Sequence, residues 1–286
     1  MAIRNHIRNP VEAVVDWVLD ASRFAGSAAQ ALRLPEDSLP APLPVSRIAV
    51  ADLRDVVAKG LDDFGAYRTD ALLLCVIYPV AGLVLAWAAF ENNLIPLLFP
   101  LASGFTLIGP LASVGLYELS RRREQTAGAL APVRAPAFGG IVLLGLVLVA
   151  IFMVWLAVAY VIFLLTLGPE PPASVAAFAR DVVATTAGRA MIAVGVGVGF
   201  LFAALVLAIG VVSFPLMLDR NVGVHTAIAT SVRAVAANPG PMALWGLIVA
   251  GSLVIGSLPA LLGLVVVMPV LGHATWHLYR KVVPRG

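Results

Sequence analysis

Charged residues are scarce in this chain, and they are missing from the interior of its longest apolar stretches. Only 12% of the 286 residues are Asp, Glu, Lys or Arg, whereas 60% are hydrophobic and the mean hydropathy is +0.97. This composition lies outside the range of soluble globular proteins. Ion-driven pumps and transporters place carboxylates or bases inside the membrane. Their absence argues against that class and against charged substrates.

Cysteine is almost absent as well. Cys75 is the only one, which excludes an intrachain disulfide and a thiolate-ligated cluster. A basic stripe with interleaved aromatic residues is also missing, so we expect no nucleic acid partner. The net charge of +3 is dispersed, and a bias of positive residues toward one side of a membrane explains it.

Six long apolar runs dominate what is present. A spanning helix needs about 20 apolar residues, and most of these runs supply that number. The sequence therefore predicts an all-α polytopic membrane protein, a bundle of six transmembrane helices in contact with the lipid bilayer. The predicted spans cover about 71–90, 94–119, 138–167, 190–218, 242–258 and 260–278. The last two are nearly continuous, and a turn is expected at Gly256–Pro259, where small residues and a proline interrupt the run.

Basic residues in the connections predict the orientation. Eight lie before the first span, four after the second, two each after the third and the fourth, and three in the tail, which includes Arg280 and Lys281; the first and fifth connections have none. Because such residues favour the cytoplasmic side, we expect both termini in the cytoplasm and the protein in a bacterial inner membrane.

The polar segments divide into three parts. Residues 1–45 are expected to form a cytoplasmic amphipathic helix and a Pro-rich linker, and residues 46–70 an interfacial amphipathic helix; residues 71–286 form the six-span domain. The apolar stripe predicted for the interfacial helix contains Leu53, Val56, Val57, Leu61 and Phe64. A further amphipathic helix is predicted within 221–239. Its apolar face is expected to hold Val224, Ala227, Ile228, Ser231, Val232 and Val235, and its other face Thr226, Thr230 and Arg233.

An internal similarity links the second and sixth spans. Pro100 and Pro110 have the same spacing as Pro259 and Pro269, and PLASVGLYELSR can be laid over PVLGHATWHLYR. We interpret this as a weak parallel repeat, in which an interfacial helix precedes a hairpin of two spans. Both transporters and duplicated proteins without transport function contain such repeats.

Polar residues gather where the even-numbered spans are expected to reach the cytoplasm. This cytoplasmic polar cluster comprises Tyr117, Glu118, Arg121, Asp219, Arg220, Trp276, Tyr279 and Arg280. Ion pairs between helices are feasible there, such as Glu118 with Arg220 or Asp219 with Arg280. The alternative is ordinary anchoring by Arg, Trp and Tyr at the interface.

His273 and His277 are weak candidates for metal ligands. They are four residues apart and share a helix face, with His225 or Glu118 as a possible third ligand. Zinc proteases with this spacing place a glutamate directly after the first histidine, whereas Ala274 stands here. The alternative is a pair of hydrogen-bonded interface histidines. Without a Ser-His-Asp constellation, a phosphate loop or paired buried carboxylates, we expect neither an enzyme nor a bound cofactor.

Gly195 and Gly199 form a small-residue face in the fourth span. In membrane helices such a face allows another helix to approach closely. A nucleotide-binding glycine loop would need a preceding strand, which the pattern does not indicate.

Three segments together, GLYELSRRRE, SFPLMLDR and GHATWHLYRK, resemble the domain of unknown function 2189 family. The likeness covers roughly residues 60–283. It implies a six-span bacterial inner-membrane protein of no established activity. Some members carry a cytochrome c oxidase label, which these residues do not support, because haem–copper chemistry needs several histidines inside helices.

Two functions follow as expectations. The first is a non-enzymatic accessory or scaffold subunit that binds another membrane complex or a second copy of itself. The alternative is a transporter or channel for an uncharged or apolar solute, since prolines inside spans free backbone carbonyls at membrane depth.

Overall fold

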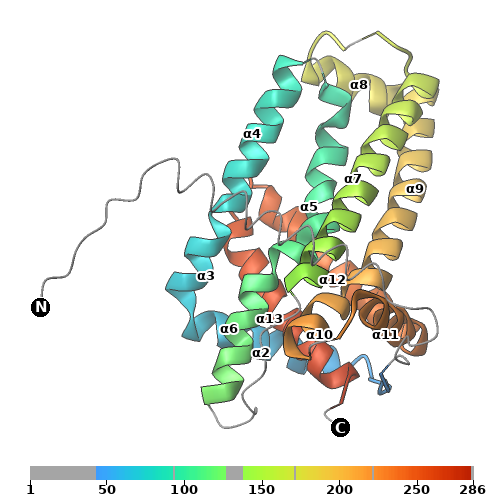
Figure 1. Ribbon diagram of the computed structural model, residues 1–286. Coiled ribbons are helices and arrows are strands. Elements are labelled where there is room, and N and C mark those ends of the chain that lie inside the picture. The colour runs from blue at the N-terminus through green and yellow to red at the C-terminus, as the bar shows by residue number, and fades with distance from the viewer. Residues whose placement is uncertain (1–42, 93, 127–137, 171, 221, 285–286) are drawn as a thin grey trace, which may run out of the picture.

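A computed structural model describes residues 43–92, 94–126, 138–170, 172–220 and 222–284, and within these ranges every regular element is a helix (Figure 1). The first half of the chain forms α2 (Asp52–Ala66), α3 (Arg68–Cys75), α4 (Ile77–Glu91), the 3-10 helix η2 (Ile95–Leu97), α5 (Leu98–Ala112), α6 (Val114–Thr126) and α7 (Phe138–Thr166). The second half forms α8 (Val175–Ala184), α9 (Thr186–Gly210), α10 (Ser213–Asp219), α11 (Val224–Ala237), α12 (Pro239–Ser257) and α13 (Leu264–Val282). The all-α prediction is confirmed for the described residues.

Helices α4, α5, α7 and α9 run side by side as a bundle (Figure 1). Four segments of the described chain are long and apolar enough to cross a membrane: Arg68–Glu91, Gly139–Thr166, Thr186–Asp219 and Pro239–Ser257. They correspond to the first, third, fourth and fifth predicted spans. The prediction of a membrane protein with several apolar helices is therefore confirmed, whereas the number of six spans is not confirmed.

The second predicted span, 94–119, is interrupted. It consists of η2, α5 and the first part of α6, and the break lies at Ser113. Pro110 lies inside α5, and because proline lacks a backbone N–H, it weakens the last turn of a helix. Neither α5 nor α6 alone reaches the length of a spanning helix.

The sixth predicted span, 260–278, is displaced along the chain. Helix α13 begins at Leu264 and continues to Val282. Residues 258–263 form a turn in which Ala260 and Leu261 have positive φ angles of 51° and 67°. Residues with a Cβ rarely adopt this conformation. The expected turn at Gly256–Pro259 thus lies later, and α13 packs against α2, α3, α6 and α12.

Polar elements gather at one end of the bundle. Figure 1 shows α2, α6, α10, α11 and the end of α13 together below the long helices, with α8 at the opposite end. We call this lower assembly the polar layer. The C-terminal residues and the segment that begins at residue 43 both lie in it. The described ends of the chain are therefore on the same side of the bundle.

An extended segment, 43–48, ties α2 to the rest of the polar layer. Its backbone N–H groups at Leu43 and Ile48 donate to Thr230 Oγ1 (3.0 Å) and Asn238 Oδ1 (2.7 Å). Ser46 N donates to the carbonyl of Val282 (2.8 Å). We call residues 43–48 the strap. The amphipathic helix predicted within residues 1–45, at positions 10–32, lies outside the described residues, as does the linker up to residue 42.

The predicted apolar faces are only partly correct. In α2, Leu53 and Val56 are buried, but Leu61 is 51% exposed. In α11, Thr226 and Thr230 are buried, although they were assigned to the polar face, while Val232 is exposed. Thr230 can be buried because its hydroxyl donates to the carbonyl of Thr226 (2.7 Å), which offsets the cost of removing a polar group from water.

The two halves of the predicted repeat have a common order of elements. In each, an amphipathic helix (α2 or α11) precedes an apolar helix and then a segment with an internal proline, Pro110 or Pro269. Helix α6, which follows the proline-containing α5, meets the proline-containing α13 in space. A Cβ on Gly272 of α13 would lie 2.5 Å from Leu116 of α6, so the helices approach closely at that point.

Candidate functional site in the polar layer

Helix α13 positions most of the candidate residues. His273, Trp276, His277 and Arg280 are three or four residues apart, so they share one side of the helix. Tyr279 and Trp276 are fully buried, with their ring centroids 5.5 Å apart. This side of α13 faces α2, α6 and α10, and it builds two separate polar networks.

The first network surrounds Asp219 at the end of α10. The carboxylate is 6% exposed and its Oδ2 accepts from the hydroxyl of Tyr279 (2.6 Å) and from Nη1 of Arg280 (2.8 Å). Arg280 also lies 3.3 Å from Oε2 of Glu124, whose Oε1 accepts from Nε1 of Trp276 (3.1 Å). The pairing of Asp219 with Arg280, one of the two expected from the sequence, is therefore present.

The other expected pair, Glu118 with Arg220, does not form. Glu118 instead accepts from Arg121 (2.7 Å) and Arg122 (2.7 Å) of its own helix. Arg220 donates to the carbonyl of Pro284 and lies 3.8 Å from Asp219. The reason is local geometry, since residues three and four apart on a helix are immediate neighbours. Tyr117 is buried beside these residues in α6.

The second network surrounds Asp63 of α2, which does not belong to the apolar stripe predicted for this helix. Asp63 is 4% exposed. Its Oδ2 accepts from the hydroxyl of Ser120 (2.6 Å) and contacts Nε2 of His277 (2.9 Å), and its Oδ1 accepts from Arg123. Nδ1 of His273 lies 2.7 Å from the Ser120 hydroxyl. Three helices, α2, α6 and α13, thus meet around one carboxylate.

The ionised form of Asp63 is strongly favoured. Burial alone would raise the pKa of this carboxyl, but hydrogen bonds from His277, Ser120 and Arg123 outweigh burial and lower its pKa to about 2. A buried carboxylate is stable only when such donors satisfy it. Asp63 is therefore a charged anchor for the packing of α2.

A signal for Asp63 was present in the sequence. Leu53, Val56, Gly60 and Asp63 are spaced by three or four residues, which places them on one helix face. All four are buried. The charge of the aspartate obscured this pattern, because its partners Ser120 and His277 lie 57 and 214 residues away.

A smaller cluster of ion pairs lies at the edge of the interface between α2 and α13. Nζ of Lys281 lies 2.9 Å from Asp52 and 3.0 Å from Asp55. Hydrogen bonding to Lys281 lowers the pKa of both carboxyls and raises that of the ammonium group. These side chains are partly exposed, so each pair contributes little to stability.

His273 and His277 do lie on one face of α13, but Asp63 and Ser120 occupy the space between them. No group of three or more His, Cys, Asp or Glu side chains in the described part of the chain converges closely enough to hold a metal ion. The third ligands considered for them are not in place: Glu118 pairs with arginines, and His225 is an exposed residue of α11. The positions of Asp63 and Ser120 therefore favour the alternative interpretation, in which the two histidines form hydrogen bonds at a helix interface.

The two glycines of the predicted packing face differ. A Cβ on Gly199 would lie 3.1 Å from the ring of Trp155, so α7 already packs there. At Gly195 no atom of the described chain would lie within 4 Å of an added Cβ. The small-residue face is thus filled at one end and open at the other.

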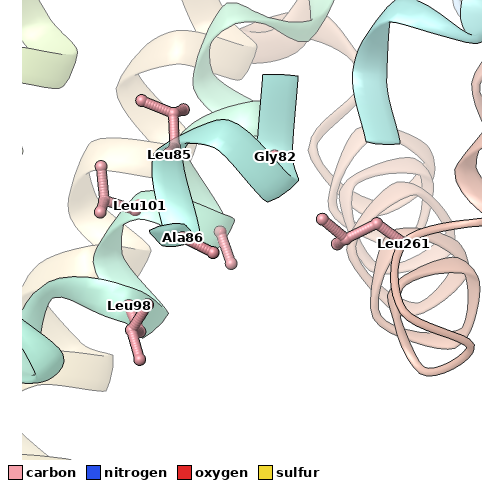
Figure 2. A pocket seen from close by; sticks show the side chains of 7 residues that line it. Gly82, Leu85, Ala86, Leu98, Leu101 and Leu261 are labelled. Atoms are coloured by element: carbon pink, nitrogen blue, oxygen red, sulfur yellow. The ribbon is translucent and has the colours of Figure 1, made fainter. Parts of the chain in front are cut away.

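An apolar groove lies apart from both networks. It has a volume of about 160 Å³ and lies between α4, α5 and the turn before α13. Figure 2 shows Leu85, Ala86, Leu98 and Leu101 on one side and Leu261 across the gap. Its lining contains no ionisable group, so it can accept only an apolar or uncharged molecule.

Comparison with known families places part of the chain in a described group of proteins. Residues 98–219 match the domain of unknown function 2189 family, described as a predicted integral membrane protein. The resemblance stated from the sequence is confirmed over this range, which is shorter than 60–283 and runs from the start of α5 to Asp219. It includes Ser120, Arg123 and Asp219, but neither α2 nor α13. No curated protein and no solved structure matches the chain.

Proposed function

We propose that the protein is a non-enzymatic accessory subunit of a bacterial inner membrane, which binds another membrane protein complex or a second copy of itself through α9. The observation that carries this proposal is the unequal burial of the apolar segments. In Thr186–Asp219 only 6% of the apolar stretch is buried inside the molecule, compared with 33% in Gly139–Thr166 and 28% in Arg68–Glu91.

The glycines of α9 make its uncovered face suitable for another helix. Gly195 and Gly197 leave notches that no atom of the described chain fills. Large apolar side chains stand beside them, including Val196, which is 58% exposed. In lipid, helices associate through close van der Waals packing at such small residues. A partner helix would fit here better than on α7, whose glycine at position 145 already faces Leu111.

The chemistry of the polar layer supports a role without catalysis. Asp63 and Asp219 are both engaged in hydrogen bonds that join helices. A catalytic carboxylate must reach its substrate, whereas these two lie in packed interfaces with 4% and 6% exposure. Their geometry serves to hold α13 in place.

The proposed orientation places the polar layer in the cytoplasm. Arg121, Arg122, Arg123, Arg220, Arg280 and Lys281 all lie at this end of the bundle. The opposite end carries Arg180 and Arg189 near α8. Positive residues favour the cytoplasmic side, so both described ends of the chain would face the cytoplasm.

The test is the size of the complex extracted from native membranes. Gly195→Leu should remove the proposed contact without disturbing the fold, because the added side chain points into open space. Native mass measurement in mild detergent should then show loss of a partner that the wild type retains. Gly251→Leu on α12 is the matched control, since that position is equally open. An unchanged complex in the Gly195→Leu variant would contradict the proposal.

The groove favours a second candidate function, passage of an apolar or uncharged solute. It lies beside an interruption of helical structure, the turn at residues 258–263, which contributes Leu261 to the lining. Unpaired backbone groups at membrane depth are tolerated where they line a cavity. Flux of uncharged solutes into proteoliposomes tests this function directly. Leu261→Trp, which should fill the groove, would then abolish the flux.

A further inference from the structure

Nε2 of His273 stands out among the buried polar atoms. The side chain is fully buried, and Nε2 is the one buried side-chain nitrogen or oxygen of the described residues that has no hydrogen-bond partner. Buried polar groups are nearly always paired, and an exception calls for a physical explanation. Here the rest of the histidine is firmly held, because Nδ1 lies 2.7 Å from the Ser120 hydroxyl.

The direction of the hydrogen bonds determines the state of the ring. A serine hydroxyl has one proton, and an ionised carboxylate can only accept. Ser120 therefore donates to Asp63 across 2.6 Å. Nδ1 of His273 must then donate to the Ser120 oxygen. A neutral imidazole with its proton on Nδ1 has a free lone pair on Nε2, so the unpartnered atom is a proton acceptor.

The charged groups around His273 come from three helices. Asp63 on α2 is the one negative charge close to the ring, and Arg123 on α6 and His277 on α13 also interact with it. Among the other helices packed on α13, α12 has no titratable side chain, α3 and α4 contribute Cys75 and Tyr78 to the neighbouring apolar cluster, and Asp219 of α10 pairs with Tyr279 and Arg280.

We propose that Nε2 of His273 is a proton-binding site, and that a proton bound there loosens α2 from α6 and α13. A proton from solvent would add to the lone pair with no bond broken. The resulting imidazolium would be a further cation beside Arg123, which already pairs with the single carboxylate of Asp63, and His277 occupies the other oxygen of that carboxylate. A buried charge without its own partner is costly. The contact that relieves this cost most directly is α2 against α13, since opening it hydrates the ring.

The protonation state of the His273 ring can be measured by nitrogen NMR of the detergent-solubilised protein with labelled histidine. The chain has four histidines, and the signal that disappears in His273→Asn identifies the residue. We expect the Nδ1–H form above neutral pH and a doubly protonated ring in acid. A ring with its proton on Nε2, or one that does not titrate before the protein unfolds, would overturn the proposal.

The movement of α2 is measured separately. Spin labels replace Lys59 on α2 and Arg122 on α6, two exposed side chains, with Cys75 changed to Ser. Burial lowers the pKa of the His273 ring to about 4. Between about pH 7 and about pH 3, a range that brackets this pKa, the distance between labels should become longer and more heterogeneous, and reversibly so.

Two variants make the result specific. His273→Asn keeps an amide donor for Ser120 and cannot titrate, so its label distance should not respond to pH. His225→Asn, at an exposed histidine on α11, should respond as the wild type does. An equal response in His273→Asn, or none in the wild type, would contradict the proposal. If His273→Asn fails to fold, the NMR titration of the wild type decides.

Discussion

Asp63 illustrates how a single side chain can organise an interface when its partners come from distant parts of the chain. The carboxylate receives Ser120 and Arg123 from α6 and His277 from α13. Removing one member of such a buried network leaves the others unpaired, which costs more than the pair contributes when intact. The consequence should be visible in stability and in its dependence on pH.

We expect Asp63→Asn to destabilise the folded protein by about 2 kcal/mol near neutral pH. A fall in pKa from 3.8 to about 2 corresponds to roughly that free energy at 1.4 kcal/mol per unit. The pKa is lowered in the folded state, so this stability is present above about pH 4 and lost as the pH falls toward about 2. Denaturant titration of the detergent-solubilised protein measures it.

Asp62→Asn is the control for this measurement. The residue is the neighbour of Asp63 in α2, but its side chain is exposed. Its removal should leave the unfolding midpoint unchanged. Equal midpoints for Asp63→Asn and the wild type would show that the buried network contributes nothing to stability.

At the scale of elements, the docking of α2 on α13 depends on a glycine. A Cβ on Gly60 would lie 2.7 Å from Cβ of Ala274 and 2.8 Å from its backbone nitrogen. Backbone atoms cannot move aside as a flexible side chain can. The two helices are therefore as close as an unsubstituted backbone permits.

We expect Gly60→Ala to weaken this docking by about 1–3 kcal/mol, the usual cost of overpacking. Gly65→Ala in the same helix should have the opposite sign, because no atom of the described chain lies near an added Cβ there and alanine favours helix by about 1 kcal/mol. Unfolding midpoints compare the two. If both substitutions stabilise the protein, α2 does not pack on α13 as described.

The strap provides a second test at this scale. Asn238 accepts from Ile48 and donates to the carbonyls of Ser46 (3.1 Å) and Ala234 (3.0 Å). Asn238→Ala leaves these groups unsatisfied, which costs about 1–3 kcal/mol for a buried group. Limited proteolysis should then cut within residues 43–50 faster than in the wild type. Asn92→Ala, at an exposed amide, should leave the rate unchanged.

Sequence patterns were informative about elements and much less so about their partners. The long runs at 138–167 and 190–218 correspond to α7 and α9, because hydropathy alone identifies helices of this length. Hydropathy does not separate a spanning helix from one buried in protein, so it predicts a span at 260–278 and gives no sign that α13 packs against α2 and α6. The break at Ser113 and the pairing of Asp63 depend on tertiary contacts, which single-sequence periodicity does not contain.

At the scale of the molecule, the polar layer and α8 lie at opposite ends of the bundle (Figure 1). This arrangement gives a direct prediction of sidedness. With Cys75 changed to Ser, a cysteine at Lys59 should react with an impermeant maleimide only in inverted membrane vesicles. A cysteine at the exposed Asp181 of α8 should react only in intact cells. The reverse result would place the polar layer outside.

The contact between α2 and α13 has a consequence for biosynthesis. His277 and Asp63 are 214 residues apart, and proteins fold from the N-terminal end as they are made. Helix α2 leaves the ribosome first, and its docking surface on α13 follows about 200 residues later. During that interval the surface of α2 that packs on α13 has no partner, and Asp63 lacks His277 although Ser120 and Arg123 of α6 are already present. The interface between α2 and α13 therefore closes only after α13 has been made, and a chain that stops before α13 leaves this face of α2 uncovered.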